Sequence, residues 1–339
     1  MTLRVRVALL VALLIAVGLG AGGYVWNVRQ SQAQNRAAAP VVARGGDLVS
    51  FRGTPHLVFR STALGNEYGR VAVVPLAAPA GPRAFTPAAC ERVYATAEDA
   101  ICLSAERGIV TRYRAQLLAA DWSPARDLPL TGLPSRARLS RDGSLAATTT
   151  FVFGDSYANP GQFSTRTLVT RTDGEVVGDI EKFALTVEGR TVTAADKNLW
   201  GVTFADDDRF YATAASGGKT WLVEGSLSRR TVKALRRDVE CPSLSPDRTR
   251  VAFKKRGDLP PGRWRLAVHD LRTGAETISS EQRSVDDQVE WLDDSTLIYG
   301  LPRTDTNGAA TSDVWRVPAD GSGPPLVLVP DAWSPAVVR

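Results

Sequence analysis

The sequence has 339 residues, of which 44% are hydrophobic and 23% are charged. These proportions are those of a globular protein, because disordered chains contain fewer apolar residues and disulfide-rich mini-proteins contain many more cysteines than the three found here. The formal charge of +5 is concentrated at the N-terminus, where residues 1–36 hold four arginines and no acidic residue. The remaining chain carries 37 basic and 36 acidic residues, which argues against nucleic acid as a partner.

The first predicted element is an apolar helix. No charged residue occurs between Arg6 and Arg29, and these 22 residues are enough to cross a hydrocarbon core about 30 Å thick. Tyr24 and Trp26 lie where interfacial aromatic residues are common. We therefore predict a transmembrane signal anchor over residues 7–28. The alternative is a cleaved signal peptide with its cleavage region near Gly22, which would leave a secreted domain.

The flanking residues predict how the chain is oriented in the membrane. Arg4 and Arg6 favour a short cytoplasmic N-terminus over residues 1–6. The rest of the chain would then be extracytoplasmic and attached to the cell membrane by a single span. Residues 29–46 are small and polar without a helical or strand period, and we expect them to form a flexible tether.

Cys90 and Cys102 stand twelve residues apart, a spacing that matches no zinc motif. In an oxidising compartment they could close a short disulfide loop, although a turn at Glu98-Asp99 would not place them directly opposite each other in a hairpin. Two buried thiols are the alternative. Cys241 has no partner in the sequence and is interpreted as a small buried residue.

From residue 47 onward, short β-branched and aromatic runs alternate with turn residues, which predicts an all-β domain. A strand-turn-strand repeat is clearest at residues 242–253, where Pro246-Asp247 forms the turn. Further copies occupy residues 138–147, 202–212 and 290–299, with weaker copies around Glu98-Asp99 and Arg52-Gly53. Each turn is followed by a third candidate strand, at residues 70–74, 113–118, 167–170, 221–223, 264–268 and 314–317.

The spacing of the turns predicts the architecture. Successive turns are separated by 46, 43, 65, 40 and 47 residues, close to the period of a four-stranded propeller blade. We predict a six-bladed β-propeller of four-stranded blades over residues 47–339, with the extra residues of the long step in loops of the third blade. Either residues 48–51 or residues 336–338 supply the strand that closes the ring.

These repeats resemble a known family. Ser245-Pro246-Asp247, the strand at 251–253 and residues 313–321 resemble the WD-like repeats of TolB-type propellers, and the resemblance extends over about residues 45–339. Residues 196–204, 239–247 and 285–294 are also similar to membrane-anchored TolB-like proteins of actinobacteria. The resemblance implies a six-bladed propeller outside the cytoplasmic membrane that acts by protein contact rather than by catalysis.

Catalytic and metal-binding motifs are absent from the sequence. It has no nucleophile elbow, phosphate-binding loop or zinc-protease motif, and we interpret the isolated His56 and His269 as structural. The acidic runs at 206–208, 286–287 and 293–294 match no calcium loop and are typical of turns. We therefore expect no cofactor and no metal.

The repeat also predicts a binding face. The segments that lead into the first strand of each blade share one face of the disk, and the Pro-Asp turns lie on the other. This arrangement gives a candidate binding face of Tyr157, Asp196, Asn198, Trp200, Glu240, Asp286, Asp287 and Gln288. Its aromatic and acidic residues would suit an interface with a basic partner. In the alternative interpretation, Trp200 and Trp291 pack between blades.

Together these features predict a non-enzymatic, membrane-tethered, monomeric propeller that binds an unidentified protein or envelope component. Two alternatives stay open: a lyase or hydrolase with an acid/base pair in the propeller channel, and a sensor that binds a sugar or peptide there. A polar pocket with convergent groups would favour either alternative, whereas a channel filled by aliphatic side chains would favour protein contact.

Overall fold

The computed structural model describes residues 3–37, 42–51, 53–108, 110–152, 164–304 and 308–339. The chain divides into two units, of which the first contains helix α1 and the second, residues 42–62 and 69–339, contains all the described strands. Each unit is described by itself.

Helix α1 (Leu3–Ala37) contains the predicted span. Among the described residues, the segment Arg4–Gln30 is long and apolar enough to cross a membrane, a test that a signal sequence also passes. Large apolar side chains such as Leu13 and Leu19 are exposed in the protein alone. The helix continues through residues 29–37, where we expected the tether to begin, because the Gln and Ala residues there are compatible with a helix. Residues 38–41 of the expected tether lie outside the described residues.

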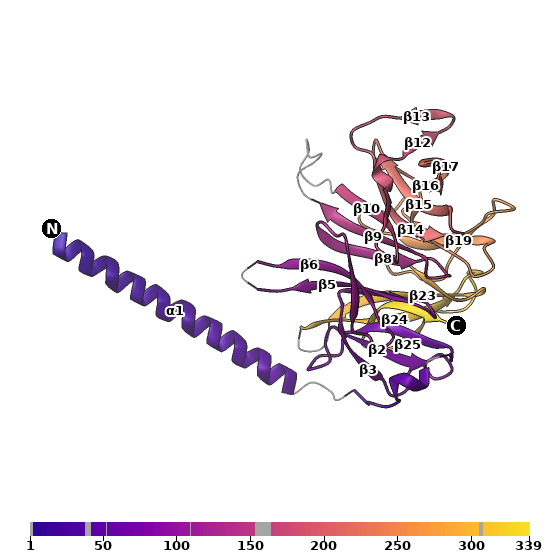
Figure 1. Ribbon diagram of the computed structural model, residues 1–339. Coiled ribbons are helices and arrows are strands. Elements are labelled where there is room, and N and C mark those ends of the chain that lie inside the picture. The colour runs from indigo at the N-terminus through magenta and orange to yellow at the C-terminus, as the bar shows by residue number, and fades with distance from the viewer. Residues whose placement is uncertain (1–2, 38–41, 52, 109, 153–163, 305–307) are drawn as a thin grey trace. The chain divides into compact units, whose positions relative to one another are not determined.

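The second unit is built from six β-sheets, as predicted, and the strands of one sheet lie side by side, as β8, β9 and β10 show in Figure 1. The strands of the first three blades and their closing strand are β26 (Ala332–Val338), β1 (His56–Ser61), β2 (Arg70–Pro75) and β3 (Ala84–Ala89) in blade 1; β4 (Arg92–Ala95), β5 (Ala100–Glu106), β6 (Arg112–Leu118) and β7 (Pro124–Leu128) in blade 2; and β8 (Leu133–Leu139), β9 (Leu145–Val152), β10 (Ser164–Arg171) and β11 (Val176–Asp179) in blade 3.

The remaining blades follow the same order along the chain. Their strands are β14 (Asn198–Phe204), β15 (Arg209–Ser216), β16 (Lys219–Ser226) and β17 (Thr231–Arg237) in blade 4; β18 (Glu240–Leu244), β19 (Arg250–Lys255), β20 (Arg265–Asp270) and β21 (Glu276–Ile278) in blade 5; and β22 (Glu290–Asp293), β23 (Thr296–Thr304), β24 (Ala310–Pro318) and β25 (Leu326–Val329) in blade 6.

The C-terminal strand closes the ring. Strand β26 pairs antiparallel with β1, with Leu57 opposite Val337, and becomes the innermost strand of blade 1. The innermost strands β26, β4, β8, β14, β18 and β22 then contact one another in this order around the ring. Residues 48–51, the other candidate for closure, form the 3₁₀ helix η1 (Leu48–Phe51), so the copy that we predicted around Arg52-Gly53 begins with this helix instead of a strand.

The long step in the repeat has a different origin from the one predicted. The extra residues include a second 3₁₀ helix, η2 (Ile180–Lys182), and the hairpin of β12 (Ala184–Val187) and β13 (Arg190–Val192). Strand β12 pairs in parallel with β17, so the hairpin enlarges blade 4 to six strands and does not form a loop of blade 3. Leu185 drives this docking, because its side chain is fully buried in the core beside Val232.

Both faces of each sheet are buried, which explains why the middle strands are almost continuously apolar. In β15, Phe210 and Ala212 pack into the core shared with blade 3, whereas Tyr211 points the other way, into the core shared with blade 5. Burying a side chain as large as Phe210 contributes about 2–3 kcal/mol. A blade cannot obtain this burial alone, so the ring must close.

Cys90 and Cys102 are joined by a disulfide, with their Cα atoms 5.4 Å apart. Cys102 lies in β5 and Cys90 precedes β4, so the bond ties the connection between blades 1 and 2 to the second strand of blade 2. The strand partner of Cys102 is Val93, and the two cysteines are not direct partners across the hairpin. Cys241 is a buried free thiol.

Candidate functional site: the axial cluster

Eight charged side chains meet around the axis of the propeller, from strands β4, β8, β18, β19 and β22 and from the segment that leads into β22. We call them the axial cluster. Its basic members are Arg92, Arg136, Arg138 and Lys254, and its acidic members are Glu240, Asp286, Asp287 and Glu290. Four positive and four negative charges balance, so the cluster is neutral as a whole.

Several ion pairs of the axial cluster join blades that are not neighbours. Arg138 of blade 3 pairs with Glu290 of blade 6 and also donates to the Val289 carbonyl at 2.6 Å. Arg92 of blade 2 pairs with Asp287, at the entrance to blade 6, at 3.0 Å. In a ring of six, blades 3 and 6 face each other across the axis. The Arg138–Glu290 pair therefore crosses the channel.

Two further contacts complete the axial cluster. Lys254 of blade 5 donates to Asp286 at 2.7 Å, and its Nζ lies 3.9 Å from Glu240. Arg136 lies 3.8 Å from the same Asp286 carboxylate. The Asp286 side chain is 66% exposed, whereas that of Lys254 is 4% exposed, so Asp286 marks the solvent end of the cluster.

A small cavity lies within the axial cluster. The cavity beside Arg92, Arg138 and Asp287 has a volume of about 20 Å³, which holds about one water molecule. The Nε atoms of Arg136 and Arg138 are buried and have no protein partner among the described residues. The side chains that line this part of the axis are charged and not the aliphatic ones that would favour protein contact, and each basic group has a carboxylate within reach.

Burial changes the protonation equilibria at the axis. Desolvation and the neighbouring Arg136 charge lower the pKa of Arg92 to about 10, despite its pairing with Asp287. Desolvation and the Glu290 carboxylate raise the pKa of Tyr94 to about 12. Both groups still hold their protons at neutral pH. Neither Arg92 nor Tyr94 is therefore poised to exchange a proton near pH 7.

Four residues of the predicted binding face come together at the axis. Glu240, Asp286 and Asp287 belong to the axial cluster, and Gln288 donates to the carbonyls of Val202 and Pro242 in blades 4 and 5. Asp287 and Gln288 are buried. These carboxylates already have basic partners within the chain, a feature that the prediction of an acidic surface did not include.

The other predicted face residues lie farther out. Asp196 accepts hydrogen bonds from Ser216 and Gly217, and the side-chain Oδ1 of Asn198 accepts from the Thr165 backbone N–H, which joins blades 3 and 4. Trp200 is only 7% exposed, so little of its ring is available to a partner. Trp291 is buried and donates to Ser243 of blade 5, as the alternative of packing between blades requires. Tyr157 lies outside the described residues.

Sequence reasoning missed the basic members of the axial cluster. A signal for two of them is present in the sequence: Arg136 and Arg138 are two residues apart in an innermost strand, and such residues point to the same side of the strand. Arg92 at the start of β4 and Lys254, the strand partner of Glu240, carry no comparable signal. Their roles depend on which blades face each other.

The remaining candidate residues have structural partners. His56 Nδ1 lies 2.7 Å from the Thr54 carbonyl, and His269 Nδ1 lies 2.9 Å from Arg236. Asp206 accepts from the Asp208 and Arg209 backbone, and Asp293 from that of Ser295, as expected for turn carboxylates. No three His, Cys, Asp or Glu side chains in the described part of the chain gather as in a metal site.

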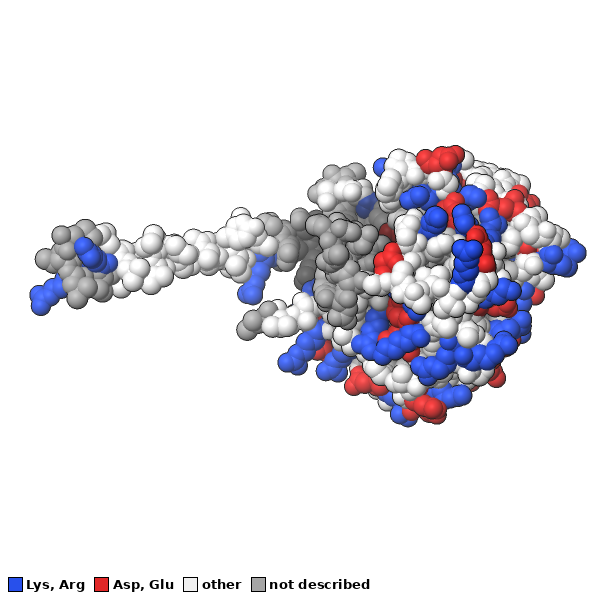
Figure 2. All heavy atoms as spheres, turned by 90° about the horizontal axis from the view of Figure 1, so that it is seen from above, with Lys and Arg blue, Asp and Glu red and all other residues white. Residues whose placement is uncertain are grey.

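Charges of both signs are interspersed over the visible surface of the propeller unit (Figure 2), without the single-sign stripe that is typical of nucleic-acid binding.

Comparisons with known proteins extend these observations. No protein-family model matches the sequence, and no curated protein matches it. Among solved structures, TolB from Acinetobacter baumannii superposes with a TM-score of 0.57 at 14% identity, covering 84% of this chain and 67% of that chain. A nidogen/laminin complex matches with a TM-score of 0.51 at 12% identity, covering 84% and 98%.

Enzymes are also found among the structural matches. A puromycin-hydrolyzing peptidase of Mycobacterium tuberculosis matches with a TM-score of 0.49 at 15% identity, covering 88% of this chain and 48% of that chain. At the low identities of the matches to TolB and to the nidogen/laminin complex, the likeness shows the fold alone. The sheet order, the closing strand and the match to TolB agree, and this chain has the fold of a TolB-like six-bladed β-propeller.

Proposed function

We propose that this protein is a non-enzymatic binding module outside the cytoplasmic membrane, tethered by its N-terminal helix, that contacts a protein or envelope component. Contact would occur through the face on which the axial cluster reaches solvent. The observation that carries the proposal is the axial cluster, because its charged groups pair with one another and the cavity among them measures about 20 Å³. A substrate of a lyase or hydrolase would need a chamber at least an order of magnitude larger.

Two further observations support this role. The disulfide between Cys90 and Cys102 is typical of an oxidising compartment outside the cytoplasm. The apolar segment Arg4–Gln30 has the length and composition of a membrane anchor. A C-terminal alkaline phosphatase fusion should therefore be active in cells, and a C-terminal reporter that is active only in the cytoplasm would contradict the topology.

Site-specific photo-crosslinking in cells tests the binding face. A photoreactive residue at Asp286, at the solvent end of the axial cluster, should give a discrete crosslinked product. The matched control is Thr249, an exposed residue beside the turn at the other end of blade 5. We expect crosslinking from position 286 and not from position 249. Equal crosslinking from both positions would contradict the proposed face.

An activity assay tests the non-enzymatic role. The purified full-length protein, incubated with isolated cell envelope, should release no new product detectable by mass spectrometry. Turnover that is abolished in Asp286→Asn and retained in Asp207→Asn, an exposed acidic residue of blade 4, would replace this proposal with a channel enzyme.

A further inference from the structure

The small cavity within the axial cluster has a mainly basic lining. Arg92, Arg136 and Arg138 line it, and Asp287 is the carboxylate in the lining. Arg92 belongs to β4, the other two arginines belong to β8, and Asp287 precedes β22, so three blades meet at this cavity. Its volume of about 20 Å³ suits a single water molecule or an ion of similar size.

The ion pairs of the axial cluster leave an excess of positive charge beside this cavity. At the other end of the cluster, Lys254 Nζ lies 2.7 Å from Asp286 and 3.9 Å from Glu240, so one basic and two acidic groups give a formal charge of −1. The end beside the cavity holds the three arginines against Asp287 and Glu290, which gives a formal charge of +1. The cluster is neutral as a whole, but its charge is divided between its two ends.

Most of this excess charge belongs to Arg136. The other two arginines each pair with a carboxylate of their own. Among the described residues, the carboxylate nearest to the Arg136 guanidinium is that of Asp286, at 3.8 Å, and it already accepts a hydrogen bond from Lys254. The Arg136 side chain is only 12% exposed, so water screens little of its charge.

Two N–H donors beside the cavity lack an acceptor. The Nε atoms of Arg136 and Arg138 are buried, and neither has a hydrogen-bond partner within the described part of the chain. The two residues are two positions apart in β8, so their side chains point to the same side of the strand. A buried charged donor without an acceptor is costly, and an acceptor in the cavity would therefore stabilise the fold.

Two of the arginines also repel each other. Desolvation, and after it the neighbouring charge of Arg136, lower the pKa of Arg92 although Arg92 pairs with Asp287. The guanidinium groups of Arg92 and Arg136 are thus close enough for their charges to interact. A negative charge in the cavity that both of them line would offset this repulsion.

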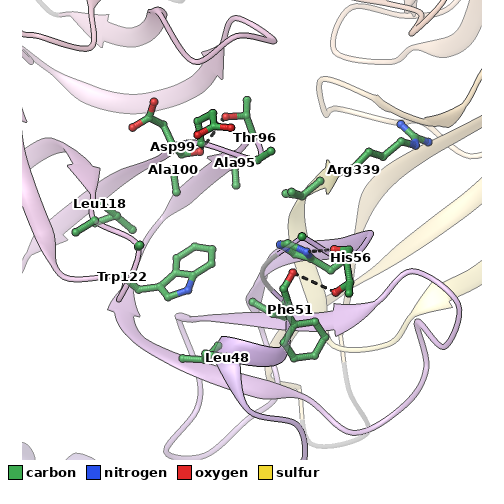
Figure 3. A pocket seen from close by; sticks show the side chains of 18 residues that line it. Leu48, Phe51, His56, Ala95, Thr96, Asp99, Ala100, Leu118, Trp122 and Arg339 are labelled. Carbon is green, nitrogen blue, oxygen red and sulfur yellow. Dashed lines mark hydrogen bonds between the residues drawn. The ribbon is translucent and has the colours of Figure 1, made fainter.

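The larger cavity between blades 1 and 2 lacks these features. Its volume is about 300 Å³, and Figure 3 shows the Trp122 ring pointing into it. Glu98 and Asp99 belong to its lining, whereas the Arg339 guanidinium points away from Trp122 and Asp99 (Figure 3). These carboxylates would repel an anion, so this cavity serves as an internal reference for the axial one.

We propose that the cavity within the axial cluster binds a monatomic anion, namely chloride. Polyatomic anions such as sulfate are too large for a space that suits one water molecule. Chloride would accept hydrogen bonds from Arg136 Nε and Arg138 Nε and would neutralise the excess charge at this end of the cluster. Because three blades meet at the cavity, the ion would hold them together at the axis. This role is independent of the proposed contact with a partner.

Urea unfolding of the full-length protein in detergent measures anion binding through stability. Sodium chloride replaces sodium gluconate at constant ionic strength, because gluconate is too large for the cavity. The variant Arg136→Met removes the least paired charge and one of the two donors. The matched control is Arg114→Met, which removes the same charge from an exposed position in β6.

Above the dissociation constant of chloride, each tenfold increase in its concentration should raise the free energy of unfolding of the natural protein by about 1.4 kcal/mol. Bromide should act like chloride, and Arg114→Met should show the same increase. Arg136→Met should lose most of it and keep only the general effect of salt on stability. Equal slopes in Arg136→Met and the natural protein, or no dependence on chloride in the natural protein, would overturn the proposal.

A second measurement applies if Arg136→Met does not fold. In crystals of the full-length protein grown in sodium bromide, anomalous scattering should place a bromide ion beside the Nε atoms of Arg136 and Arg138 and none in the cavity beside Trp122. The absence of bromide from the axial cavity would contradict the proposal.

Discussion

Glu181 illustrates how burial in this propeller controls a single side chain. Both of its carboxylate oxygens lie 2.9 Å from the Leu199 backbone nitrogen, and the Thr165 hydroxyl donates to it at 2.8 Å, so the side chain ties η2 to blades 3 and 4. Burial nevertheless raises the pKa of Glu181 from 4.5 to about 8. A carboxyl group whose pKa is higher in the folded chain than in the unfolded chain makes the fold less stable as the pH rises between the two pKa values.

This shift predicts a pH dependence of stability. Between pH 4.5 and pH 8 the unfolded chain ionises Glu181 and the folded chain does not, so the free energy of unfolding should fall by about 1.4 kcal/mol per pH unit from this residue. Glu181→Gln removes the titration and keeps an acceptor for Leu199. Urea unfolding from pH 5 to pH 8 should show the variant gaining stability relative to the natural protein as pH rises.

Glu175→Gln, at an exposed position in blade 3, is the control and should show no such trend. A difference in the free energy of unfolding between Glu181→Gln and the natural protein that stays constant from pH 5 to pH 8 would contradict the prediction. It would show that Glu181 is already ionised at pH 5 and that its pKa is not raised.

At the scale of the element, the disulfide links two segments that the strand ladder does not pair. Cys90 lies outside β4, and the bond holds this connection against β5. By constraining the unfolded chain, a loop of this length contributes about 2–3 kcal/mol. C90A/C102A should therefore lower the free energy of unfolding by that amount, as measured by urea unfolding of the full-length protein.

Thiol alkylation provides a direct check of the disulfide. In the unfolded chain without reductant, only Cys241 should react, and all three cysteines should react after reduction. Alkylation of three thiols without reductant would show that the bond does not form in the cell.

Sequence patterns predict some elements of this propeller and not others. The turns at Asp142, Asp247 and Asp294 and the third strand of each blade were predictable, because they depend on neighbouring residues. The closing strand could not be predicted, because the two candidate segments, residues 48–51 and 336–338, are both short and apolar. Pairing with β1 decides between them, and it uses residues from opposite ends of the chain.

At the scale of the whole molecule, the axial cluster acts as a set of cross-links between blades. Arg138 and Glu290 are both nearly buried and belong to opposite blades. Glu290→Gln leaves the Arg138 charge without its counter-ion, and we expect a loss of about 3–5 kcal/mol in the free energy of unfolding. R138M/E290L removes both charges and should be less destabilised than Glu290→Gln.

The exposed pair Arg114–Glu106 is the matched control, and Glu106→Gln should cost less than about 1 kcal/mol. Urea unfolding of the full-length protein measures all three variants. A Glu290→Gln variant as stable as Glu106→Gln would show that the axial pair does not hold the ring together.

Only part of the candidate sites could be predicted. The order of segments around the disk placed Glu240, Asp286 and Asp287 on one face, and the structure brings them together. Their pairing with Arg92, Arg136 and Lys254 was not predictable, since Arg92 and Asp287 are 195 residues apart.

The sequence by itself determined an apolar N-terminal segment, an all-β domain and six repeats, because these follow from local hydrophobic patterns and turn residues. The tertiary structure alone decided that β26 closes the ring, that the hairpin of β12 and β13 enlarges blade 4, and that charged residues from opposite blades pair at the axis. Strand periodicity acts between near neighbours, whereas ring closure and burial of charge act between residues that meet only after the blades have packed.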